Sequence, residues 1–139
     1  MKKLAALLMV IVMVFSITAC GGGNASGGED GMITAVIEID YPDGCGNADV
    51  EDFHIAVPEG TNALELLQLY GEANGVEITL ATTSPTVYVT AIGGIAESAD
   101  AGWVYEVDDE MTMDAADQHT VQAGQTITWE YMTWSELSE

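Results

Sequence analysis

The chain has no Lys or Arg after residue 3, and this absence limits what kind of domain it can form. Lys2 and Lys3 are the only residues of those two types, whereas all 23 Asp and Glu follow residue 20. A domain built from the later residues therefore forms no salt bridge through Lys or Arg. Its carboxylate repulsion is offset only by cations, helix dipoles and screening. Removal of both lysines changes the formal charge from −21 to −23.

The N-terminal segment predicts export. Leu4 to Ala19 is almost wholly apolar, but it is shorter than the roughly 20 residues that span a bilayer, so it is typical of a cleavable signal peptide. Its end, Ile17-Thr18-Ala19-Cys20, resembles the bacterial lipobox, in which the Cys is acylated and becomes the first residue after cleavage. A plain secretory signal is the alternative interpretation.

We expect residues 1–19 to be a lipoprotein signal peptide and Cys20 to be lipidated. Two acyl chains give stable anchoring, so the predicted localisation is extracytoplasmic, with a lipid anchor in the bacterial cell membrane. Residues 20–31 are rich in Gly and Ser and predict a flexible tether. The remainder suffices for one small domain at 32–134, followed by an acidic tail at 135–139.

Hydrophobic periodicity predicts an α+β domain. Alternating apolar residues predict a hairpin of two strands, at 33–41 and 53–57. A helix follows, capped by Thr61 or Asn62, with Glu65 completing a capping box and Gly75 ending it. Gly71 weakens this helix, which suggests close packing against a strand. Further strands are predicted at 76–81, 86–92, 102–107 and 126–132.

Four segments together resemble successive blocks of the transcobalamin-like C-terminal domain family. They are Val57–Leu67, Val87–Ile95, Gly102–Asp109 and Val121–Tyr131. The resemblance implies a β-grasp-like fold, with one helix packed on a mixed sheet of about five to six strands. In vertebrate relatives this kind of domain closes over cobalamin that is bound against a separate helical barrel. Cobalamin is thus a candidate ligand, and a helical-barrel protein is a candidate partner.

Aromatic residues alternate along the last two long strands. Trp103 and Tyr105 share one face of the first, and Trp129 and Tyr131 share one face of the second. Two interpretations remain open: an aromatic ladder within the core, or a surface on which a planar ligand stacks. On the second interpretation these four residues are the candidate ligand-binding site.

Nothing in the sequence predicts catalysis. His54 and His119 lie far apart and no nucleophile motif accompanies them. Cys45 is the only cysteine besides Cys20, so a lipidated Cys20 leaves it without an intramolecular disulfide partner, and acidic surroundings do not favour its thiolate. Without Lys or Arg to neutralise phosphates, nucleic-acid binding is not expected. We therefore assign no catalytic residue.

Acidic clusters make calcium a weaker candidate ligand. One cluster surrounds residues 40–52 and another residues 108–117, but neither has EF-hand spacing, so no metal ligand is assigned.

Two function hypotheses follow from the sequence. The first is a surface-anchored, non-catalytic module that binds a small molecule, with cobalamin or another corrinoid as candidate. The second is an extracellular interaction or adhesion module that docks on a basic protein. A solvent-exposed Trp103 or Trp129 would favour the first, and aromatic residues wholly buried in the core would favour the second.

Overall fold

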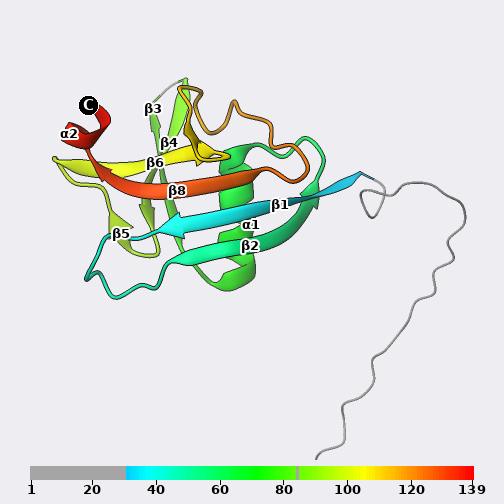
Figure 1. Cartoon of the computed structure of the whole chain (residues 1–139), viewed down its shortest axis with the longest axis horizontal. Coiled ribbons are helices and arrows are strands. Elements are labelled where there is room, and N and C mark those ends of the chain that lie inside the picture. The colour runs from blue at the N-terminus through cyan, green and yellow to red at the C-terminus, as the bar shows by residue number, and fades with distance from the viewer. Residues whose placement is uncertain (1–30, 84) are drawn as a thin grey trace, which may run out of the picture.

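The protein folds into two sheets and one long helix, as the computed structural model in Figure 1 shows for residues 31–83 and 85–139. The predicted signal peptide, Cys20 and almost all of the predicted tether lie outside these residues. The elements are β1 (Met32–Asp40), β2 (Val50–Pro58), α1 (Ala63–Asn74), β3 (Ile78–Thr83), β4 (Thr86–Ile92), β5 (Ile95–Ala96), β6 (Ala101–Val107), β7 (Glu110–Met111), β8 (Thr126–Thr133) and α2 (Trp134–Leu137). The predicted α+β class is confirmed. In the described part of the chain, no helix has the length and apolar character that would let it cross a membrane.

The larger sheet has five strands in the order β2-β1-β8-β6-β7. β1 and β2 form the predicted antiparallel hairpin. β1 also pairs in parallel with β8, whereas β8, β6 and β7 pair antiparallel. A mixed sheet with its parallel pair at the centre and one helix across it is the β-grasp-like arrangement that the family resemblance implied.

A separate sheet of three strands has the order β3-β4-β5. The strand predicted at 76–81 begins two residues later, at Ile78, and the two-residue strands β5 and β7 were not predicted. β4 pairs with β3 along one edge, and its last two residues, Ala91 and Ile92, pair with β5 on the other. Figure 1 shows α1 and the β3–β4 hairpin behind the larger sheet, running across its strands.

Helix α1 begins and ends where the sequence predicts. The Asn62 side chain accepts a hydrogen bond from the Glu65 amide at 2.8 Å, and the Glu65 carboxylate accepts one from the Asn62 amide at 3.1 Å. Gly71 lies against the start of β3, because a Cβ there would come 2.6 Å from the Val76 carbonyl oxygen and 2.8 Å from Ile78 Cγ1. The predicted close packing is confirmed.

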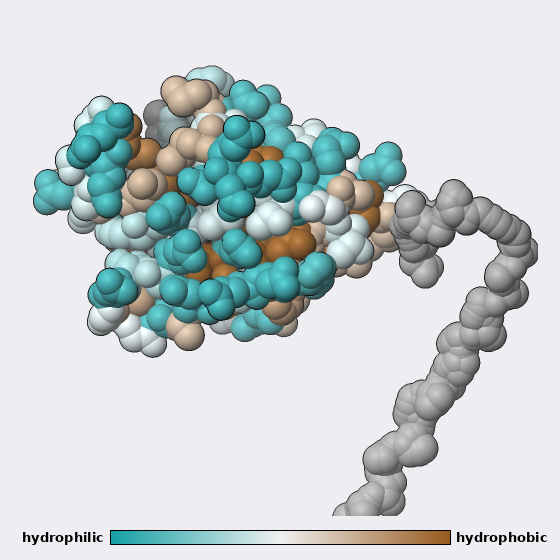
Figure 2. All heavy atoms as spheres, in the orientation of Figure 1, coloured by the Kyte–Doolittle hydropathy of each residue, from teal (hydrophilic) through white to brown (hydrophobic). Residues whose placement is uncertain are grey.

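The core lies between the inner face of the larger sheet and α1. Ile37, Ile39 and Ile127 of the sheet are fully buried, as are Leu66 and Leu67 of the helix. Each such side chain contributes roughly 1.5–3 kcal/mol relative to an exposed one. The opposite face of the larger sheet is not covered by the helix, and hydrophilic residues are spread across it with a few hydrophobic ones between them (Figure 2).

The chain end differs from the expected acidic tail at 135–139. Residues 134–137 form α2, which begins with a capping box between Thr133 and Glu136. The Trp134 amide donates a hydrogen bond to the Asp100 carbonyl oxygen at 2.9 Å. These bonds fix α2 against the loop that precedes β6, so the ordered domain continues beyond residue 134.

Candidate functional site

The four aromatic residues proposed from the sequence form two cross-strand pairs. Trp103 lies opposite Tyr131, and Tyr105 lies opposite Trp129. The ring centroids of the two pairs are 5.3 and 5.2 Å apart. Trp103 and Tyr105 are each 7% exposed and Trp129 is 3% exposed, while Tyr131 is half-buried. The aromatic ladder is therefore present, and most of its surface belongs to the core.

Hydrogen bonds fix three of these side chains. The Trp103 Nε1–H donates to the Ile95 carbonyl oxygen at 2.8 Å, and the Tyr131 hydroxyl donates to the Ala96 carbonyl oxygen at 3.0 Å. The Tyr105 hydroxyl donates to the Asp114 carbonyl oxygen at 2.7 Å. Burial, followed by the charge of Asp114, raises the pKa of Tyr105 above 10.0, so this hydroxyl remains a donor. The ladder thereby connects the larger sheet to β5 and to the loop after β7.

Trp129 differs from the other three. Its Nε1–H is buried and has no hydrogen-bond partner among the described residues. A buried donor without a partner costs about 1–3 kcal/mol. Trp129 is thus the one member of the ladder whose polar atom the protein does not use.

A cleft of about 830 Å³ opens beside this ladder, which we call the aromatic cleft. Its floor contains Trp103, Tyr105 and Trp129, whereas Tyr131 does not line it. The walls come from β4, from β6 and β7 with the loop after them, and from α2. The lining residues are Ala81, Thr86, Val87, Tyr88, Val89, Thr90, Glu97, Trp103, Val104, Tyr105, Met111, Thr112, Met113, Asp114, Ala115, Ala116, Trp129, Trp134 and Leu137.

Exposed hydrophobic side chains surround the mouth of the aromatic cleft. Among residues 31–83 and 85–139, the five large hydrophobic residues with the greatest exposure all line it. They are Tyr88 (53% exposed), Met111 (42%), Met113 (96%), Trp134 (40%) and Leu137 (38%). Sequence reasoning missed these residues, because exposure depends on how the β3–β4 hairpin and α2 pack. Together they form an apolar rim over an aromatic floor.

The chain end forms part of that rim. The Trp134 ring lies directly over Gly102, where any side chain would collide with the indole. Leu137 follows one helical turn later and also lines the cleft. α2 therefore places two apolar side chains at the cleft mouth.

The ionisable groups of the cleft are acidic. Glu97 and Asp114 line it, together with the hydroxyl-bearing Thr86, Thr90 and Thr112. After residue 3 the chain has no Lys or Arg to meet an anion. This lining suits a neutral or cationic ligand with a large apolar surface.

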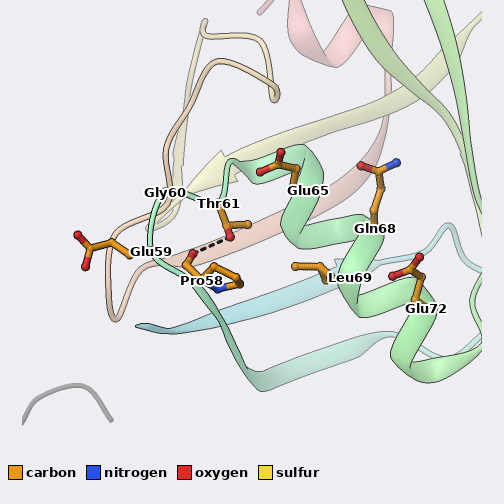
Figure 3. Close-up of a pocket in the computed structure, with 8 residues that line it drawn as sticks. All are labelled: Pro58, Glu59, Gly60, Thr61, Glu65, Gln68, Leu69 and Glu72. Carbon is orange, nitrogen blue, oxygen red and sulfur yellow. Dashed lines mark hydrogen bonds between the residues drawn. The ribbon is translucent and has the colours of Figure 1, made fainter. Parts of the chain in front are cut away.

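A second, smaller groove of about 540 Å³ lies beside the N-terminal half of α1 (Figure 3). In Figure 3, Leu69 points toward Pro58, whereas Glu59 points away from the helix. Glu65, Gln68 and Glu72 follow the same helix, and Glu65 is already engaged in the capping box. The Thr61 hydroxyl donates to the Pro58 carbonyl oxygen at 2.6 Å. This groove is smaller than the aromatic cleft and has no aromatic residue in its lining, so the aromatic cleft is the better candidate.

The two histidines lie apart. His54 is 61% exposed and lies 3.3 Å from the Asp52 carboxylate. His119 is half-buried rather than freely solvated, with Nε2 at 3.2 Å from the Gln125 side-chain oxygen. Cys45 is a free, partly buried thiol in the loop after β1. Within residues 31–83 and 85–139, no group of three His, Cys, Asp or Glu side chains is arranged to hold a metal ion.

Residues 60–133 match the family model described as "Domain of unknown function (DUF4430)". The chain belongs to this DUF4430 family. The matched DUF4430 residues contain the whole aromatic ladder and three of the five rim residues, Tyr88, Met111 and Met113. The rim residues Trp134 and Leu137 lie outside the match, as does the β1–β2 hairpin. No curated protein matches the chain.

Solved structures similar to this DUF4430 protein include haptocorrin in complex with Cbi. That likeness has a TM-score of 0.65 and 15% sequence identity, and it covers 81% of this chain but 27% of haptocorrin. The chain thus corresponds to about a quarter of haptocorrin and has its transcobalamin-like fold there. A candidate metal-binding protein from Ruminococcus gnavus ATCC 29149 has a TM-score of 0.49 and 11% identity, covering 75% of this chain and 98% of that one.

Proposed function

We propose that this protein binds a small molecule in the aromatic cleft. The observation that carries the proposal is the rim: the five most exposed large hydrophobic residues gather around a single cleft with an aromatic floor. Apolar clefts with a few polar groups are the usual form of ligand sites. Exposed apolar side chains that gather in this way mark a binding surface more than scattered ones do.

The lining defines the class of ligand. Because the cleft has two carboxylates and no cation, the ligand is neutral, cationic or metal-bearing. A corrinoid meets these requirements, and the fold shared with haptocorrin, which was solved with Cbi, supports it as the leading candidate. A separate helical protein that completes the site belongs to the same proposal.

The remaining parts of this function rest on the sequence. The protein acts outside the cytoplasm, anchored to the membrane through Cys20, and the proposed activity is binding without catalysis. Trp103 and Tyr105 form part of the cleft floor, while Tyr131, which does not line the cleft, packs against Trp103. The rim residues, above all Met113 and Trp134, make the direct contacts.

Titration with corrinoids tests this proposal directly, because all three tryptophans line the cleft. Soluble residues 21–139 are titrated with a panel of corrinoids, with tryptophan fluorescence and calorimetry as readouts. Saturable quenching with matching heat is expected. Met113→Ala should weaken binding by about tenfold or less, since one rim side chain contributes roughly 1 kcal/mol. Leu69→Ala, in the groove beside α1, is the matched control and should bind normally. If no corrinoid in the panel changes the fluorescence or releases heat, corrinoids are excluded as ligands.

A second function is favoured by the outer face of the larger sheet. Asp40 on β1 lies beside Glu130 on β8. Burial and then the charges of Glu106, Asp40 and Glu136 raise the pKa of Glu130. A cationic protein surface would relieve this repulsion. Calorimetry with oligolysine tests docking: binding that weakens with salt and with Glu130→Gln supports it, whereas no heat at low salt rejects it.

A further inference from the structure

The three-stranded sheet is built from the one long stretch of the domain that carries no charge. No Asp, Glu, Lys, Arg or His occurs between Glu77 and Glu97. That stretch contains all of β3, β4 and β5. In a chain with 23 acidic residues, this sheet is a neutral region on an otherwise strongly negative molecule.

β3 is a free edge of this sheet. It pairs with β4 on one side only, and its other side has no strand partner in the described part of the chain. Helix α1 approaches it closely at its first residue, where Gly71 meets Ile78. Further along, Thr79, Ala81 and Thr82 are exposed. Backbone N–H and C=O groups on such an edge can accept another strand.

The β2 edge of the larger sheet differs from β3 in charge and in backbone conformation. β2 carries Glu51 and Asp52, and Asp52 adopts a positive φ of 50° where the pairing register shifts. Charges and bulges are devices that prevent a sheet edge from pairing. β3 has neither a charge nor a positive-φ residue among its described positions. Of the β2 and β3 edges, only β3 lacks these devices.

We propose that β3 pairs antiparallel with β3 of a second copy of this chain. The two three-stranded sheets then form one sheet of six strands around a twofold axis. The distribution of charge leaves this edge available to a second copy: elsewhere two copies repel each other through their carboxylates, whereas residues 78–96 bring no charged side chain to the contact. With a twofold axis near Leu80 and Ala81, the two Glu77 residues lie ~24 Å apart at ~3.4 Å per residue. That separation exceeds the ~8 Å screening length at physiological salt.

The pairing also places two ligand sites near each other. β4, the neighbour of β3, lines the aromatic cleft from Thr86 to Thr90, and Ala81 of β3 lines it too. A dimer through β3 therefore carries one aromatic cleft on each half of a continuous sheet.

Cysteine cross-linking of the full chain in membranes tests the dimer. Single cysteines replace Thr79, Ala81 or Thr82 in a Cys45→Ser background, and copper phenanthroline serves as oxidant. Ala56→Cys, an exposed alanine on the β2 edge, is the matched control. At least one β3 variant should cross-link roughly tenfold faster than Ala56→Cys, because a docked pair holds its thiols at an effective concentration in the millimolar range.

Two further measurements use the β3 variant that cross-links fastest. Raising salt from ~0.01 to ~0.15 M should speed its cross-linking, because screening weakens repulsion between the copies. An added glutamate at one of the other two exposed β3 positions should slow it, whereas glutamine there should not. Rates equal to that of Ala56→Cys at all three positions would overturn the proposal, as would equal rates for the glutamate and glutamine variants.

Discussion

The two sheets of this protein differ in burial, charge and free edges. The larger sheet buries Ile37, Ile39 and Ile127 against α1 and places Asp40 and Glu130 on the opposite face. The smaller sheet carries no charge, leaves β3 without a second strand partner among the described residues and supplies Tyr88 to the rim of the aromatic cleft. The larger sheet thus supplies much of the core together with the cleft floor, while the smaller one supplies a neutral strand edge and one rim residue.

The exposure of the rim residues has a physical basis. A surface that binds a ligand needs exposed apolar groups, and such groups stabilise the free protein little. The protein places these groups outside its core: Tyr88 lies on β4, Met111 and Met113 lie on β7 and the loop after it, and Trp134 and Leu137 lie on α2. Loss of a rim residue should therefore affect binding without affecting folding.

The largest expected effect is a difference in the free energy of unfolding between a variant in the larger sheet and one in the smaller sheet. Ile37→Ala in β1 removes a fully buried side chain and should lower the free energy of unfolding by about 2–5 kcal/mol. Leu80→Ala in β3, which is half-buried, should cost about 1 kcal/mol. Urea denaturation of both variants measures the difference. Equal losses would show that the two sheets contribute equally to the core.

An intermediate effect is expected where α1 meets the smaller sheet. Gly71→Ala brings a Cβ against the Val76 carbonyl oxygen and Ile78, and should destabilise the protein by about 1–3 kcal/mol. Helix propensity alone predicts a gain of about 1 kcal/mol, so the sign of the change decides between the two effects. Ala73→Gly, at an exposed position of the same helix, is the control and should cost about 1 kcal/mol.

The smallest effect concerns charge on the larger sheet. Burial first, then nearby carboxylates, raise the pKa of Asp40 above 3.8 and that of Glu130 above 4.5. Ionising these groups opposes folding, so their contribution to stability improves as pH falls through the raised pKa values. Asp40→Asn with Glu130→Gln should raise the melting temperature at pH 7, and this gain should vanish below pH 3.8.

A matched control for the charge experiment is Asp43→Asn, on the exposed loop after β1. It removes one negative charge away from the Asp40–Glu130 pair, half of the change made by the double variant. A gain at pH 7 at least half as large as that of the double variant would mean that total charge, and not this pair, limits stability.

Local signals in the sequence were sufficient for most of the fold. The capping residues Asn62 and Glu65 predict the start of α1, and the alternation in β1, β6 and β8 predicts those strands. The division into two sheets was not predicted, because strand pairing is decided by contacts between distant residues. The two-residue strands β5 and β7 are too short to show a period.

The candidate site was predicted only in part. The sequence indicated the ladder of Trp103, Tyr105, Trp129 and Tyr131, and three of these four form the cleft floor. The rim was missed, since Met113 and Trp134 look like ordinary apolar residues until the fold exposes them. By the criterion set from the sequence, the burial of Trp103 and Trp129 favours the interaction module and counts against stacking of a ligand on the ladder. The proposed small-molecule site therefore rests on the rim, where Trp134 is exposed.

The absence of Lys and Arg also protects the chain backbone. Proteases that cut after these residues find no susceptible peptide bond anywhere in residues 4–139. This protection lies in the covalent sequence, so it persists when the domain opens or unfolds. Resistance to this class of protease thus needs no stability from the fold, and the same residues present no side-chain amine to acylating reagents.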